Sequence, residues 1–172
     1  LQQALFRITE LSMTADSLER FYADLHSIIG ELLYAKNFYV AFLSDDGKHI
    51  EFPYAADEVD TRPHRDRTRA KGLTEYVIDT GHALLADRAR IRSLESEGLV
   101  SSFGPLAYCW LGVPLTRDDV AVGVIGVQSY TDDISFVERD QELLTFVAHH
   151  VDAALARKRA QSRLVAAHAE LE

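Results

Sequence analysis

The sequence predicts an α+β domain in which helices are segregated to one side of an antiparallel sheet. Residues 37–55 and 107–130 both have hairpin character, because apolar strands flank short turns rich in charged residues and glycine. Helical periodicity marks both ends of the chain, and no strand-helix-strand unit repeats between them. A sheet built from hairpins is antiparallel, so we expect its main helices to gather on one face.

The first half of the predicted domain is a helix followed by a hairpin. Apolar residues spaced three and four positions apart predict a helix over residues 18–33, with Asp16 or Ser17 as its cap. Residues 37–43 place apolar side chains on both faces, which is typical of a central strand. An Asp-Asp-Gly turn then returns the chain along residues 49–55.

The middle of the chain is mostly polar. Residues 57–71 have no periodicity and predict a long basic loop. Residues 72–82 predict a short helix closed by Gly81, and residues 83–86 predict a short strand. Residues 88–97 have the composition of another helix.

The last third predicts a second hairpin and a long helix. Strands over residues 107–115 and 120–130 are joined by a charged turn. A helix begins near Phe136 and meets no breaker before the end of the chain.

Composition excludes several classes of function. The chain has 172 residues, a formal net charge of −9 and a pI near 5.2, which argues against nucleic acid as a partner. A single cysteine, Cys109, excludes an internal disulfide and a multi-cysteine zinc site and fits a reducing compartment. No apolar run is long enough to span a bilayer, so we expect a cytoplasmic domain without direct membrane contact.

Three segments together carry a family resemblance. "GLTEYVIDTGHALLADR", the strand pair "WLGVPL" and "AVGVIGVQSY", and the closing "FVERDQELLTFVAHHVDAALARKRA" resemble GAF domains in this order and spacing. The resemblance implies a profilin/PAS-like sheet of about six strands. It also implies terminal helices on one face, with loops and short helices over a pocket on the other. It further implies a regulatory module of bacterial signalling proteins.

The resemblance also sets the expected domain boundaries. We expect residues 1–172 to form a single GAF domain with its core at about 18–155. Residues 1–15 and 156–172 are then helical connectors to flanking domains of a longer parent chain.

Few residues offer catalytic or metal chemistry. In some GAF domains a cysteine holds a bilin, but Cys109 precedes Trp110 rather than a histidine, and a strand cysteine is usually a small hydrophobe. One thiol cannot complete the disulfide cycle of the family's methionine sulfoxide reductases. The histidines and the acidic pairs of the turns lack metal-ligand spacing. We therefore expect no enzyme activity, metal or cofactor.

A ligand pocket is expected where cations and aromatic tips converge. Five cations lie between Arg62 and Lys71, and in the family this segment lies near the pocket rim. The plainer alternatives are a solvated loop that neutralises neighbouring acids and aromatic residues that pack in the core. The residues expected to line the pocket are Tyr54, Arg65, Arg67, Arg69, Tyr76, Cys109 and Tyr130.

A coiled-coil seam is expected along the last helix. Apolar residues repeat there with alternating four- and three-residue spacing, which is typical of helices that pair. The alternative is the surface helix of a lone domain. The seam residues are Leu144, Ala148, Val151, Leu155 and Val165.

The sequence thus favours a non-enzymatic sensory GAF domain. We expect a homodimer formed through the terminal helices, with a small-molecule effector possible and a catalytic output domain in the same chain. That output is either cyclic-di-GMP synthesis or breakdown, or a sensor histidine kinase. The alternative is a purely structural dimerisation module without a ligand.

Overall fold

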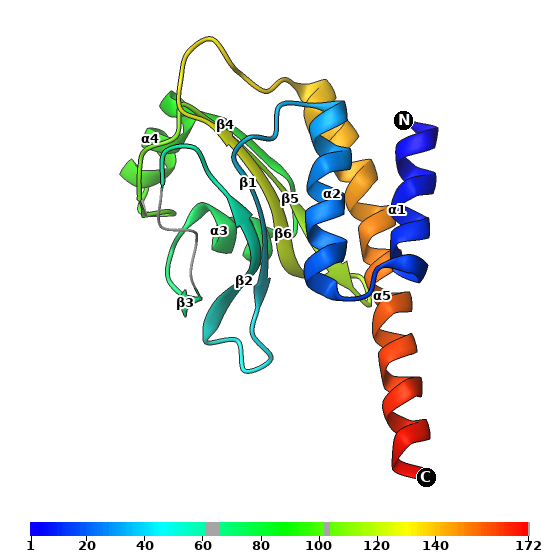
Figure 1. The fold of residues 1–172 in the computed structure, drawn as a ribbon. Helices are drawn as coiled ribbons and strands as arrows, with labels where there is room; N and C mark the ends of the chain where they lie inside the picture. Colours follow the sequence, from blue (N-terminus) through cyan, green and yellow to red (C-terminus); the bar gives the residue numbers. More distant parts are fainter. Residues whose placement is uncertain (61–65, 102–103, 172) are drawn as a thin grey trace.

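The fold is organised around one antiparallel sheet, seen in a computed structural model that describes residues 1–60, 66–101 and 104–171. The six strands lie in the order β3-β2-β1-β6-β5-β4 (Figure 1). Their bounds are β1 (Phe38–Leu43), β2 (His49–Ala56), β3 (Arg67–Thr68), β4 (Leu84–Asp87), β5 (Cys109–Arg117) and β6 (Val120–Ser129). The predicted antiparallel sheet of about six strands is confirmed.

Helices lie on both faces of this sheet but in unequal layers. The helices are α1 (Gln2–Thr14), α2 (Leu18–Leu32), α3 (Leu73–Thr80), α4 (Arg88–Ser96) and α5 (Glu138–Leu171). Helices α2 and α5 cover one face and α1 packs outside them, whereas α3 lies on the opposite side (Figure 1). We call these sides the helix-layer face and the α3 face.

Local sequence signals account for the ends of two helices. Ser17, rather than Asp16, caps α2, because its hydroxyl accepts a hydrogen bond from the Arg20 N–H at 3.2 Å. Gly81 ends α3 with a φ of 70°, and its N–H donates to the Val77 carbonyl. Both helices begin and end close to the predicted positions.

The β5–β6 connection is a two-residue turn. Asp118 and Asp119 have φ values of 53° and 63°, which matches the twist that a tight hairpin needs. The predicted turn also included Arg117, which instead pairs with Val120 at the end of the ladder. Elsewhere, the predicted loop over residues 57–71 contains the short strand β3, which pairs with His49 and Ile50 of β2.

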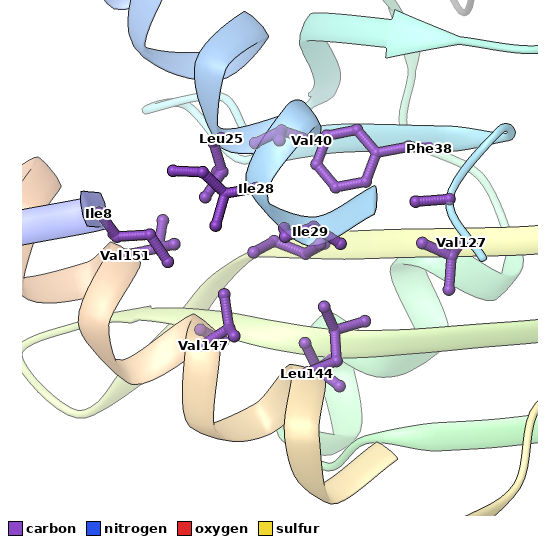
Figure 2. Packing of buried hydrophobic residues seen from close by; sticks show 14 of the residues in the cluster. Ile8, Leu25, Ile28, Ile29, Phe38, Val40, Val127, Leu144, Val147 and Val151 are labelled. Carbon is purple, nitrogen blue, oxygen red and sulfur yellow. The ribbon is translucent and has the colours of Figure 1, made fainter. Parts of the chain in front are cut away.

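The main core fills the helix-layer face. Figure 2 shows Ile28 and Ile29 of α2 and Leu144 and Val147 of α5 converging on the sheet. Ile8 of α1 lies beside Val151 of α5 and is fully buried. Helix α1 therefore packs on the domain and contributes to its core.

The predicted dimer seam is largely internal. Four of its five residues belong to the main core of the same chain and are at most 3% exposed: Leu144, Ala148, Val151 and Leu155. Only Val165, at 65% exposure, is free on the surface of α5. The four-three spacing was read correctly as an apolar stripe, but the assignment of these four residues to an interface between chains was wrong.

Candidate functional site

The expected site is the α3 face of the sheet, and aromatic rings fill its floor. The ring of Trp110 lies across Gly112, and that of Tyr39 lies across Gly126. A Cβ atom at either glycine would overlap the ring above it, so each glycine provides the space that its aromatic neighbour occupies. Trp110 and Tyr39 belong to a second apolar cluster with Val77 of α3.

A buried hydrogen bond joins α3 to the sheet. The Tyr39 and Thr74 hydroxyls are 2.7 Å apart, and both side chains are buried. Burial raises the pKa of Tyr39 well above its ordinary value, so this phenol stays neutral. The α3 face is thus closed by packing and by a neutral hydroxyl pair.

Arg67, expected to bind a ligand, is committed to a buried ion pair. Its guanidinium donates to both carboxylate oxygens of Glu75, at 2.6 and 2.7 Å, and lies 5.8 Å from the Phe52 ring centroid. The Ala70 N–H donates a further bond to Glu75 at 2.7 Å. The Glu75 side chain is 2% exposed and that of Arg67 25%, so the pair is shielded from water.

The charge on Glu75 is maintained by these partners. Burial alone would raise the pKa of this carboxyl, but the bonds from Arg67 and Ala70 outweigh burial and lower the pKa. Arg67 is thus not the solvated loop cation of the plainer alternative, and its guanidinium is already engaged by Glu75. The pair instead ties β3 to α3.

Arg69, another predicted pocket cation, has a different partner from Arg67. Arg69 forms an ion pair with Asp79 of α3, and both side chains reach solvent. Arg65 lies outside the described residues. Tyr76 is half-buried on α3, and Lys71 is exposed.

Tyr130 belongs to a separate polar cluster after the end of β6. Its hydroxyl donates to the Asp57 carboxylate at 2.6 Å, and the Gln128 amide donates to the same oxygen at 3.2 Å. The other Asp57 oxygen accepts the N–H groups of Val59 and Asp60. Burial, and then the bond to Asp57, raises the pKa of Tyr130. This cluster fixes the start of the loop that follows β2.

Tyr54 and Cys109 lie on the helix-layer face, so their assignment to the pocket was wrong. The Tyr54 hydroxyl is 2.8 Å from His26 Nδ1, and His26 Nε2 is 2.6 Å from the Ala35 carbonyl. Cys109 is 3% exposed within the main core, where burial raises the pKa of its thiol. A protonated, enclosed thiol is a poor nucleophile.

The sequence therefore missed most of the residues that organise the α3 face. Glu75 carried a detectable signal: a lone carboxylate among the apolar residues of "LTEYVI", beside a loop rich in arginine. A buried acid of this kind needs a cation, and the loop supplies it. Tyr39 and Asp57 gave no comparable signal, because their partners come from distant elements.

Further chemistry is limited in the described parts of the chain. Within residues 1–60, 66–101 and 104–171, no group of three or more potential ligand side chains could hold a metal ion. In the same ranges, no helix combines the length and the apolar character needed to cross a membrane.

One sheet between a three-helix layer and a thin layer of short helices is the architecture of regulatory α+β domains of the profilin/PAS type. The chain belongs to the GAF domain family, whose model matches residues 15–156. That match covers the whole sheet and the part of α5 that packs on it.

Three solved structures share the fold. The GAF domain of a phosphoenolpyruvate-protein phosphotransferase from Acinetobacter has a TM-score of 0.71 at 16% identity, covering 92% of this chain and 94% of that one. The free methionine-R-sulfoxide reductase of Neisseria meningitidis has a TM-score of 0.72 at 13% identity, covering 93% and 90%. Residues 122 to 287 of a methyl-accepting chemotaxis protein have a TM-score of 0.73 at 12% identity, covering 92% and 99%. No curated protein matches the sequence.

Proposed function

We propose that this GAF domain is a non-enzymatic regulatory module that dimerises through its terminal helices and acts on an output domain in the same chain. The observation that carries the proposal is α5, one continuous helix of 34 residues whose second half leaves the sheet with an exposed apolar stripe (Figure 1). An isolated helix with such a stripe gains stability by pairing.

This stripe lies on a different side of α5 from the seam that the sequence predicted. It includes Phe146, Leu164 and Leu171, which are 51%, 73% and 85% exposed. With alternating four- and three-residue spacing it comprises Phe146, His150, Ala153, Arg157, Ala160, Leu164, Ala167 and Leu171. On α1, Phe6 and Met13 are also exposed and lie seven residues apart. Both helices thus offer apolar surface beyond that used by the core.

Contacts between the sheet and α5 provide a route for regulation. At the end of β5, the Thr116 N–H and hydroxyl donate to Asp152 of α5 at 3.0 and 2.8 Å. Lys158 of α5 donates to the Ala15 carbonyl, which links α5 to the α1–α2 connection. A displacement of this end of β5 would therefore move the part of α5 that continues into the stripe.

The lack of catalysis is proposed from the chemistry of the chain. A sulfoxide reductase shares the fold, but Cys109 is the one thiol in this sequence and lies enclosed in the core. Two other structural relatives come from a phosphotransferase and a chemotaxis protein, which supports a role within a larger signalling chain.

A second candidate function is a dimerisation module that binds nothing on its α3 face. The rings of Trp110 and Tyr39, which occupy the floor of that face, favour this candidate. Native mass spectrometry of the purified protein separates the two: a retained small molecule supports a sensor. The bare polypeptide mass supports the structural module.

Sedimentation velocity tests the dimer. We expect the unmodified chain to sediment as a dimer at about 100 μM and Leu164→Glu to weaken association at least about tenfold, because a charge enters the seam. Val165→Glu, which alters the adjacent exposed residue outside the stripe, is the matched control and should still dimerise. A monomeric unmodified chain, or dissociation by Val165→Glu alone, would contradict the proposal.

A further inference from the structure

A groove lies on the helix-layer side of the sheet, at the end where both hairpins turn. Its volume is about 1010 Å³. The start of α2 forms one wall through Leu18 and Tyr22, and Phe42 of β1 lies in its lining. Arg117 at the end of β5 and Arg159 of α5 are also part of the lining. Its lining also includes Leu43 and Phe52, which pack against the apolar cluster of the α3 face, so the groove extends around the β1–β2 hairpin.

The two arginines give the groove a cationic end. The Arg159 guanidinium is half-buried and lies 5.8 Å from the Phe42 ring centroid. Within the described residues, neither the Arg159 nor the Arg117 guanidinium has an ion pair or a hydrogen bond to a carboxylate. The Asp152 carboxylate, which acts electrostatically on Arg159, already accepts two bonds from Thr116.

The proximity of the two cations affects the pKa of Arg159. Burial, and then repulsion by Arg117, lowers the pKa of Arg159. Both effects disfavour the charged guanidinium, so an anion placed between the arginines would relieve them. An anion that reached this half-buried position would form charge-assisted hydrogen bonds that water screens only partly.

The other lining residues restrict which chemical groups a ligand of this groove can have besides one anion. Asp45, Glu51 and Asp66 line the groove and also a neighbouring cavity of about 700 Å³, whose lining includes Arg67 but neither Arg117 nor Arg159. The Arg67 guanidinium is already paired with Glu75. The three carboxylates therefore mark the end away from Arg117 and Arg159. The rest of the lining is mostly apolar and aromatic, with Tyr22 and Phe42 among its side chains, and it includes one further acid, Glu19 of α2. A second anionic group at the far end would be repelled.

We propose that this groove binds an aromatic monocarboxylate, with its carboxylate between Arg117 and Arg159 and its ring on Phe42 and Tyr22. One anionic head matches the unpaired guanidinium pair, and a flat apolar body matches the lining. Because Arg159 lies where α5 leaves the sheet, an occupied groove would hold this part of α5 against β1. The binding site does not depend on whether the chain dimerises.

Titration with 2-naphthoate, followed by calorimetry, tests the site. We expect saturable binding that weakens as salt is raised and is absent with the neutral 2-naphthylmethanol. Arg159→Gln should weaken 2-naphthoate binding by about tenfold or more, which is the range for one charge-assisted hydrogen bond. Leu18→Ser, an exposed change in the apolar wall, should weaken it severalfold with the unfolding midpoint unchanged.

Arg20→Gln is the matched control. Arg20 lies in the same turn of α2 as the groove wall but does not line the groove, so binding should stay within about twofold. Absence of 2-naphthoate binding to the unmodified chain would overturn the proposal. Equal losses in Arg20→Gln and Arg159→Gln would also overturn it, as would an effect of Arg159→Gln on sedimentation alone, which would assign the groove to a second copy of the chain.

Discussion

At the scale of single residues, two arginines from one predicted loop have opposite roles. Arg67 belongs to a shielded pair with Glu75, whereas Arg69 and Asp79 form their ion pair in contact with solvent. Removing one partner of a buried pair leaves an uncompensated charge, and removing one partner of an exposed pair leaves a hydrated one.

Arg67→Ala and Arg69→Ala should therefore differ strongly in stability. We expect Arg67→Ala to lower the free energy of unfolding by about 3 kcal/mol, because Glu75 stays buried without its cation. Arg69→Ala should change it by less than about 1 kcal/mol. Urea denaturation measures both values, and equal effects would show that water reaches the Arg67 pair as freely as the Arg69 pair.

Glu75 also makes stability depend on pH in one direction. Its folded-state pKa lies below the ordinary value of 4.5, so the unfolded chain binds the proton more tightly. The stabilisation is complete above about pH 4.5 and is lost as pH falls through the lower, folded pKa.

Comparison with Glu75→Gln isolates this contribution. The unmodified chain should lose more stability than Glu75→Gln between pH 5 and pH 3, because glutamine cannot take up the proton. Urea midpoints recorded at several pH values give both slopes. Parallel slopes for the two proteins would show that Glu75 titrates alike in the folded and unfolded chains.

At the scale of elements, glycines in the sheet lie where an aromatic side chain crosses the strand. A Cβ atom at Gly126 of β6 would meet the Tyr39 ring, whereas a Cβ atom at Gly30 of α2 meets nothing within 4 Å. Replacement of glycine by alanine should therefore lower the stability of the fold at Gly126 and raise it at Gly30.

Gly126→Ala and Gly30→Ala form a matched pair. We expect Gly126→Ala to destabilise the fold by roughly 1–3 kcal/mol through overpacking. Gly30→Ala should stabilise it by up to about 1 kcal/mol, since alanine favours the helix interior. Thermal unfolding of both variants checks the signs, and a neutral Gly126→Ala would mean that the Tyr39 ring shifts without cost.

The sequence predicted the strands, but it did not predict which face of the sheet each strand residue occupies. The sequence predicted the strand that carries Tyr54, but an irregularity between β1 and β2 shifts the register between the pairs Val40–Tyr54 and Phe42–Glu51. A bulge of this kind breaks the alternation on which a sequence argument depends. Ile50 and Phe52 pack with the cluster of the α3 face, so strict alternation would place Tyr54 there too, whereas Tyr54 packs on the helix-layer face.

At the scale of the whole molecule, the order of elements was predictable and the use of α5 was not. Hairpin turns and helix caps are local signals, so the sheet and its covering helices followed from them. An apolar stripe with four-three spacing fits a core and a coiled coil equally well. Only the folded chain shows that Leu144 and Val151 belong to its own core, whereas Phe146 and Leu164 are exposed.

In the proposed dimer, two copies of the chain pair through the α5 stripe, with their two α5 helices parallel. Spin labels at three stripe positions, Ala153→Cys, Ala160→Cys and Ala167→Cys in a Cys109→Ala background, test it by pulsed electron paramagnetic resonance. In a parallel dimer with helix axes about 8–10 Å apart, all three distances between copies should be short and similar. An antiparallel pair would separate at least one of the three by about 20 Å along the helix. That separation, or the absence of any distance between copies, would contradict the claim.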